Sequence, residues 1–170
     1  MMIRFIPLVA LMAAAVPLAA MSDTVGSQFD VTITLVNTCD VTTTAPTDMN
    51  FGDTVGLLTS EVTATSTITV NCSENATYDI GIDAGANESS TGDTNTRRML
   101  MSDGNGDHYV TYDLLQPDGI SHWGDTISTD TYSSTGTGSP QAFTVNGKVG
   151  VQSTPPAGYY SDTVQVTVTY

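Results

Sequence analysis

Residues that could carry out catalysis or bind a metal are few in this sequence of 170 residues. The two histidines are His108 and His122, and neither stands at ligand spacing from another histidine, a cysteine or a pair of carboxylates. The sequence has no Gly-x-Ser-x-Gly nucleophile motif and no glycine-rich phosphate loop before a helix. The many acidic residues are scattered, and two carboxylates without a cleft indicate no active site. We therefore expect a protein that is not an enzyme, with no metal site and no small-molecule cofactor.

Residues 103–107 read Asp-Gly-Asn-Gly-Asp and resemble the start of a calcium-binding loop. The sixth position of such a loop is a glycine and the twelfth a glutamate, whereas here they are His108 and Leu114. We therefore interpret the segment as a hairpin turn.

Residues 1–20 have the layout of a secretory signal peptide: Arg4, an apolar core and an alanine-rich end near Ala20. Pro7 and Pro17 interrupt the apolar run, which is shorter than the roughly 20 residues of a membrane-spanning helix. We expect cleavage near Ala20 and export through the periplasm to the cell surface. About 150 residues remain, which is the size of one domain.

The charge of the chain argues against two classes of partner. Removal of the leader takes away Arg4 and no acidic residue, so the formal net charge goes from −14 to −15. Binding of nucleic acid requires clustered Lys and Arg, and so does docking to anionic lipid. We expect neither partner.

Two cysteines, Cys39 and Cys72, follow the leader. In an exported protein an even pair predicts a disulfide, and closing a loop of this length stabilises the fold by about 3.5–4 kcal/mol in the chain-entropy model. The alternative, two thiolate ligands of a metal, lacks a nearby histidine or a Cys-x-x-Cys spacing.

Apolar residues recur at every second position in several segments, often with threonine between them. This period is typical of half-buried strands, and β-branched threonine suits their solvent face. The runs are Phe29, Val31, Ile33 and Leu35; Val62, Ala64, Ser66, Ile68, Val70 and Cys72; Tyr78, Ile80 and Ile82; Phe143, Val145, Val149 and Val151; and Val164, Val166, Val168 and Tyr170. Stretches rich in Gly, Asn, Asp, Ser and Pro separate them, which predicts an all-β antiparallel sandwich in one domain.

The first run, Phe29 to Leu35, lies directly after the leader and before Cys39. It is either the first strand of the domain itself or a donor strand that completes a neighbouring molecule. The alternating pattern does not separate these two hypotheses.

Two further features have structural interpretations. Arg97 and Arg98 are expected at the surface or paired with carboxylates across strands, with a contact between subunits as the alternative. Trp123, the single tryptophan, is expected in the core or at its rim.

Motifs distributed over most of the mature sequence resemble the spore coat protein U domain family, which overlaps the pilins of archaic, Csu-type chaperone–usher pili. Their order and spacing carry the resemblance. The motifs are Asn37-Thr38-Cys39, Asn50-Phe51-Gly52, Ile68-Thr69-Val70-Asn71-Cys72, Tyr78-Asp79-Ile80-Gly81-Ile82-Asp83, Arg97-Arg98-Met99, Tyr109-Val110-Thr111-Tyr112-Asp113-Leu114, Trp123-Gly124-Asp125, and residues 156–170 from Pro156-Ala157-Gly158-Tyr159-Tyr160 to Tyr170.

The resemblance implies an incomplete immunoglobulin-like antiparallel β-sandwich of the pilin type. A periplasmic chaperone would lend it the missing strand, and at an outer-membrane usher the N-terminal donor strand of another subunit would replace that strand. The implied organisation is a signal peptide at 1–20, an N-terminal extension with the donor strand at 21–38, and a sandwich domain at 39–170. The donor residues would be Phe29, Val31, Ile33 and Leu35. The acceptor groove would be bordered by the last strand, with Val164, Val166, Val168 and Tyr170, after which no residues remain for a further strand.

The leading hypothesis is therefore a structural subunit of a chaperone–usher pilus or related surface fibre, with a role in adhesion or biofilm formation. Its expected partners are identical or homologous subunits, the chaperone and the usher. The alternatives are a spore or cyst coat component, and a secreted binding module whose N-terminal strand folds back into its own sandwich.

Overall fold

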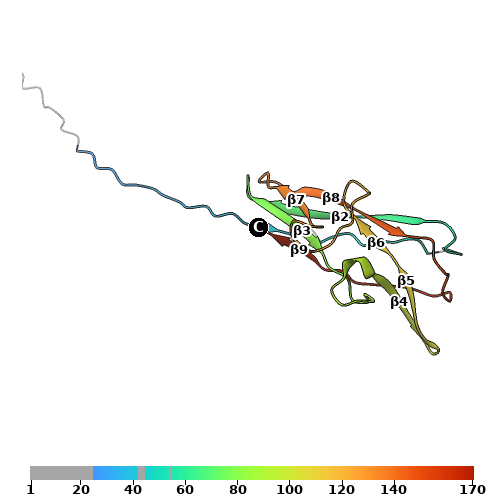
Figure 1. Ribbon diagram of the computed structural model, residues 1–170. Coiled ribbons are helices and arrows are strands. Elements are labelled where there is room, and N and C mark those ends of the chain that lie inside the picture. The colour runs from blue at the N-terminus through green and yellow to red at the C-terminus, as the bar shows by residue number, and fades with distance from the viewer. Residues whose placement is uncertain (1–24, 42–44, 54) are drawn as a thin grey trace, which may run out of the picture. The chain divides into compact units, whose positions relative to one another are not determined.

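The computed structural model of the chain describes residues 25–41, 45–53 and 55–170, and these residues form an all-β fold (Figure 1). The predicted leader, residues 1–20, lies outside them. The elements are β1 Cys39–Asp40, β2 Val62–Cys72, β3 Thr77–Ile82, the 3-10 turn η1 Thr94–Thr96, β4 Arg98–Asp103, β5 Gly106–Thr111, β6 Asp113–Leu115, β7 Tyr132–Thr135, β8 Gln141–Val149 and β9 Val166–Thr169. The chain divides into two units, Met1–Thr34 and Leu35–Tyr170, and every one of these elements belongs to the second unit.

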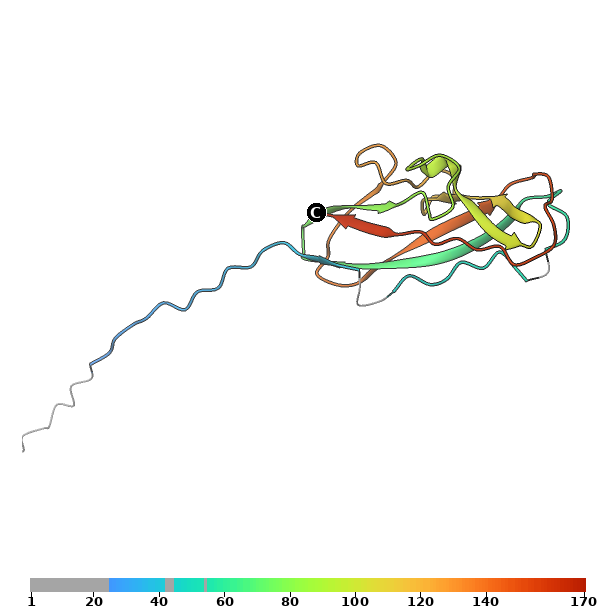
Figure 2. The same ribbon diagram turned by 90° about the horizontal axis from the view of Figure 1, so that it is seen from below.

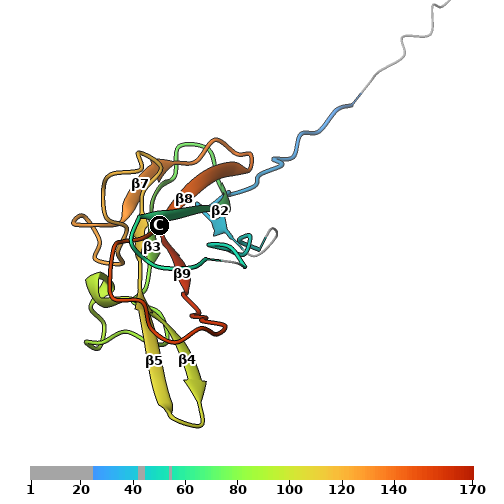
Figure 3. The same ribbon diagram turned by 90° about the vertical axis from the view of Figure 1, so that its right-hand side faces the viewer.

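The strands form three antiparallel sheets. The largest has the order β1-β2-β8-β6, the second has the order β7-β3-β9, and β4 and β5 form a two-stranded hairpin. Figure 2 shows β9 alongside β3, and Figure 3 shows the β4–β5 hairpin extending away from the two larger sheets. The predicted all-β antiparallel fold class is confirmed.

Strand β2 shows how the alternating sequence builds the core. Ser66, Ile68, Val70 and Cys72 are buried, while the residues between them face outward. The strand pairs with β8 in a continuous register from Val62 opposite Val149 to Val70 opposite Gln141. Burial of each large apolar side chain contributes about 1.5–3 kcal/mol. The main core cluster consists of Ile68, Val70, Cys72, Ala76, Tyr78, Ile80, Ile82, Leu114, Trp123, Phe143 and Val145.

The ends of several predicted strands differ from the sequence pattern. Strand β8 ends at Val149, and Val151 is 68% exposed beyond it. Of the run from Val164 to Tyr170, only the four residues Val166–Thr169 form β9. Residues 103–106 form the predicted hairpin turn, with Asp103 opposite Gly106 in the β4–β5 register, and Gly106 has a positive φ of 134° that suits glycine.

Candidate functional site

The segment Phe29 to Leu35 is the most apolar exposed stretch of the described residues. Residues 25–38 have no assigned strand or helix, and the four alternating side chains Phe29, Val31, Ile33 and Leu35 are 83–86% exposed. A contiguous run of large exposed apolar side chains marks an interaction site, because their contact with water is unfavourable. The segment therefore has the alternating sequence of a strand, but it pairs with no strand in the described part of the chain.

Strand β9 presents an open edge. It pairs on one side with β3, from Asp79 opposite Thr169 to Ile82 opposite Val166. On its other side it has no strand partner among residues 25–41, 45–53 and 55–170. An edge strand offers unpaired N–H and C=O groups to an added strand.

The core beside β9 is only partly covered. Val164, Val166 and Val168 pack against the main core cluster but remain partly exposed, and so do Cys39, Val41 and Met49. Tyr170 is 62% exposed. We call Val164, Val166 and Val168 the acceptor edge. The alternating sequence predicted an inward face for these three valines, whereas Val41 and Met49 lie outside any alternating run and were not predicted to contact the core.

The predicted disulfide between Cys39 and Cys72 is confirmed. It joins β1 to the last residue of β2, where the two cysteines are register partners. The backbone of Thr38 adds three hydrogen bonds to Ser73. Its carbonyl accepts from the N–H (2.9 Å) and the hydroxyl (3.4 Å) of Ser73, and its N–H donates to Ser73 Oγ (3.1 Å). The chain is therefore fixed to the sandwich from Thr38 onward, three residues after Leu35.

Two aspartates hold the segment that leads into β9. Asp162 Oδ1 accepts from the N–H of Ala86 (3.0 Å) and from Asn87 Nδ2 (2.8 Å), and its Oδ2 accepts from the hydroxyl of Tyr112 (2.7 Å). Asp83 Oδ1 accepts from the N–H of Gln165 (2.8 Å). Burial and the hydrogen bond to Asp162 raise the pKa of Tyr112, so the hydroxyl stays protonated and keeps donating. These contacts fix the position of the acceptor edge relative to β3.

Comparison with known proteins decides the family. The model of the spore coat protein U domain family matches residues 25–167. The chain belongs to this family. A comparison with curated proteins gave no match.

Two solved structures resemble this spore coat protein U domain. One is the CsuC–CsuE chaperone–tip adhesion subunit pre-assembly complex from archaic chaperone–usher Csu pili of Acinetobacter baumannii, with a TM-score of 0.54, 22% identity, and coverage of 81% of this chain and 40% of that chain. The other is a chaperone–tip adhesin complex of CFA/I fimbriae biogenesis, with a TM-score of 0.38, 15% identity, and coverage of 78% and 41%. The chain thus spans about two-fifths of the length of each matched chain. At 22% identity, the likeness to the Csu complex concerns the fold.

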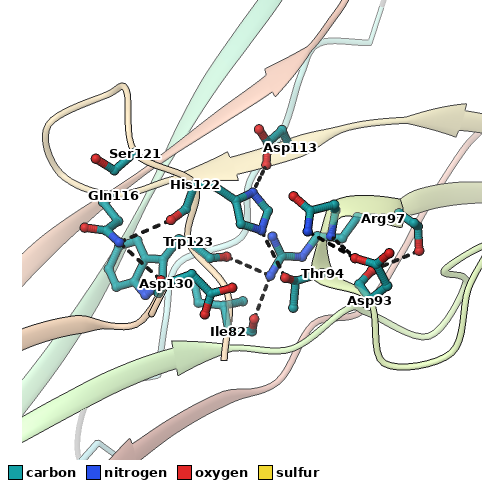
Figure 4. A network of polar contacts seen from close by, with 12 residues as sticks. Ile82, Asp93, Thr94, Arg97, Asp113, Gln116, Ser121, His122, Trp123 and Asp130 are labelled. Carbon is teal, nitrogen blue, oxygen red and sulfur yellow. Dashed lines mark hydrogen bonds and ion pairs between the residues drawn. The ribbon is translucent and has the colours of Figure 1, made fainter. Parts of the chain in front are cut away.

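A polar cluster in the spore coat protein U domain has the side-chain order of a hydrolase triad (Figure 4). His122 contacts Asp113 through Nδ1 (2.7 Å to Oδ1) and Thr94 through Nε2 (3.0 Å to Oγ1). Thr94 is only 5% exposed, so its hydroxyl is closed to a substrate, whereas a nucleophile must reach the bond it attacks. The hydrogen bonds of the cluster instead connect β6, η1 and the loop that precedes Trp123.

Arg97 corrects an expectation from the sequence, because its side chain is completely buried and is not paired at the surface. Its Nε donates to the carbonyl of Asp83 (2.8 Å), and its Nη2 donates to the carbonyls of Ile82 (2.6 Å) and Trp123 (2.9 Å). Burial lowers the pKa of Arg97, and the charges of nearby acidic groups oppose this shift. The guanidinium binds backbone groups at the end of β3, which explains its position in the core.

Arg98 donates to the carbonyls of Asn87 (3.0 Å) and Glu88 (3.0 Å) and lies 3.9 Å over the ring of Tyr109. Trp123 is fully buried, as predicted, and donates to the carbonyl of Ile80 (2.8 Å).

Across residues 25–41, 45–53 and 55–170, no three His, Cys, Asp or Glu side chains gather as metal ligands. Within the same ranges, no helix has the length and apolar character needed to cross a membrane.

Proposed function

We propose that this chain is a structural subunit of a chaperone–usher pilus or related surface fibre, and that it polymerises by donor-strand exchange. Residues 28–36 of one copy add to the open edge of β9 in another copy. The observation that carries the proposal is the combination of an exposed, alternating strand sequence with an unpartnered strand over a partly covered core.

The donor segment, residues 28–36, and the open edge of β9 are complementary. Phe29, Val31, Ile33 and Leu35 have the same two-residue spacing as the partly buried residues of β9. Full burial of four such side chains contributes roughly 6–12 kcal/mol before the cost of ordering the segment. Main-chain hydrogen bonds to the free edge add affinity, and the alternate side chains supply specificity.

The partners and location follow from this function. An open core edge requires cover before assembly because an exposed strand edge promotes aggregation. A periplasmic chaperone would supply this cover, and the Csu structure whose fold this chain resembles is itself a complex of a chaperone and a pilus subunit before assembly. The proposal includes cleavage of residues 1–20, export to the cell surface through an outer-membrane usher, and a role in adhesion or biofilm formation. It assigns residues 21–38 to the donor extension, residues 39–170 to the sandwich, and no catalytic activity to either.

The experiment compares the mature chain with and without residues 22–38 after periplasmic expression, using unboiled samples on a denaturing gel. The proposal predicts a ladder of stable multimers that requires residues 22–38. A soluble monomer that unfolds on this truncation would contradict it and favour a self-complemented binding module.

A second candidate, a component of a spore or cyst coat, is favoured by the description of the matched family. Such a component would use the same strand exchange in a layered assembly. Immunogold labelling of intact cells separates the two, because a pilus subunit labels thin surface fibres and a coat component labels a continuous layer.

A further inference from the structure

An exposed apolar patch lies at the end of the sandwich where β2 begins and β8 ends. Leu57 and Val151 are 72% and 68% exposed, and Val55 is 44% exposed. The N–H of Gln152 donates to the carbonyl of Leu58 (3.1 Å), which places the two segments side by side, as Figures 1 and 2 show. We call Val55, Leu57 and Val151 the distal patch. The opposite end, with the Cys39–Cys72 disulfide and Thr169, is the proximal end.

The direction of an added strand decides which end the next copy reaches. Every strand pair among the described residues is antiparallel. Strand β9 runs toward the proximal end, because Thr169 pairs with Asp79 near the turn that follows Cys72. An antiparallel donor strand therefore places its Phe29 at the proximal end and directs its Leu35 toward the distal end.

The length of the connecting chain brings the next copy to the distal patch. From Phe29 to Leu35 an extended strand spans about 20 Å, and the three steps from Leu35 to the anchored Thr38 add at most about 11 Å. Together they reach about as far as the 11 residues of β2, which span roughly 33 Å between the proximal and distal ends. The connector is too short to hold the two sandwiches apart.

We infer that the distal patch of one copy is covered by the proximal end of the next copy, with Val36 in contact with Leu57 and Val151. Val36 is 75% exposed and lies outside the alternating donor residues, so strand exchange alone does not bury it. This inference rests on the proposed function and adds a second, end-to-end interface between copies to it. Each covered end then restricts the angle between successive subunits.

The test crosslinks pairs of introduced cysteines with a flexible bis-maleimide after assembly, since Cys39 and Cys72 are already bonded and do not react. The double variant Val36→Cys with Leu57→Cys is expected to give multimers that survive boiling. The control, Val36→Cys with Ser133→Cys, uses an exposed position in β7 opposite Asp79, on the other side of β3 from β9, and its multimers are expected to be lost on boiling.

A third pair tests the opposite orientation. Ser139 is exposed at the proximal end, where the neighbouring Gly138 N–H donates to the carbonyl of Cys72 (3.0 Å). Boiling-resistant multimers with Val36→Cys and Ser139→Cys, and none with Leu57→Cys, would overturn the inference while leaving strand exchange intact. The absence of a ladder in the unboiled samples of every variant would refute the proposed function itself, and this inference with it.

Discussion

Replacement of Ile33 by aspartate places a carboxylate among the apolar side chains of residues 29–35. In the free chain Ile33 is 83% exposed, so the substitution leaves the stability of the sandwich unchanged. In a strand-exchanged pair, the same position loses about 1.5–3 kcal/mol of apolar burial and also carries the cost of several kcal/mol for a buried, unpaired charge. The total of about 5 kcal/mol or more weakens the pairing by more than about a thousandfold.

Thr34→Asp is the matched control, because it adds the same charge one residue later on the opposite face of the strand. A surface substitution of this kind changes stability by about 0.5 kcal/mol or less. On an unboiled denaturing gel, Ile33→Asp is expected to run as a monomer and Thr34→Asp as a ladder. A normal ladder from Ile33→Asp, or equal loss from both variants, would refute the assignment of the inward face of the donor strand.

Three further predictions concern the sandwich. Arg97→Met removes the donor that binds the carbonyls of Ile82, Asp83 and Trp123, so it should destabilise the fold by about 3 kcal/mol or more. Arg98→Met is the control and should destabilise the fold less. Thermal unfolding measures both losses, and equal losses would contradict a special role for Arg97. Replacing both Cys39 and Cys72 by alanine should lower the free energy of unfolding by about 3.5–4 kcal/mol in urea titrations, and a loss below about 1 kcal/mol would show that the rest of the fold already restrains this loop. Because the pKa of Tyr112 is raised in the folded state, this residue ionises first in the unfolded chain, and the free energy of unfolding should fall as the pH rises above about 10. The free energy of unfolding of Tyr112→Phe should fall less steeply between pH 9 and 11. Identical slopes for the two proteins would contradict the prediction.

The strands that the sequence predicted best are those with threonine between buried residues. In β2 the buried residues alternate with threonine and asparagine, so the two-residue period of the sequence matches the two-residue period with which strand side chains change face. The disulfide was predictable because the sequence contains two cysteines, and both follow a predicted secretory leader. The hairpin at residues 103–106 was predictable because its turn residues act locally.

Arg97 could not be placed from the sequence because its partners are backbone carbonyls. Every residue carries such a group, and only the tertiary fold brings those of Ile82, Asp83 and Trp123 to one point. The same limit applies to Asp162, whose partners lie 50 to 76 residues away in the sequence. The alternation in residues 29–35 identifies a strand sequence, but the identity of its partner depends on which edge is open in the fold.

The attachment at Thr38 and Cys39 determines how a pulling force would travel through the molecule. Tension arriving along residues 29–35 reaches the disulfide directly after Thr38 and passes across it to Cys72. The force therefore enters β2 at its last residue and not through the chain that leads from β1 to Val62. The force continues along the axis of β2, whose nine register partners in β8 share it in shear, so their hydrogen bonds must break together and not one after another. A covalent bond at the point of entry thus transfers a pulling force directly to a strand that is paired along most of its length.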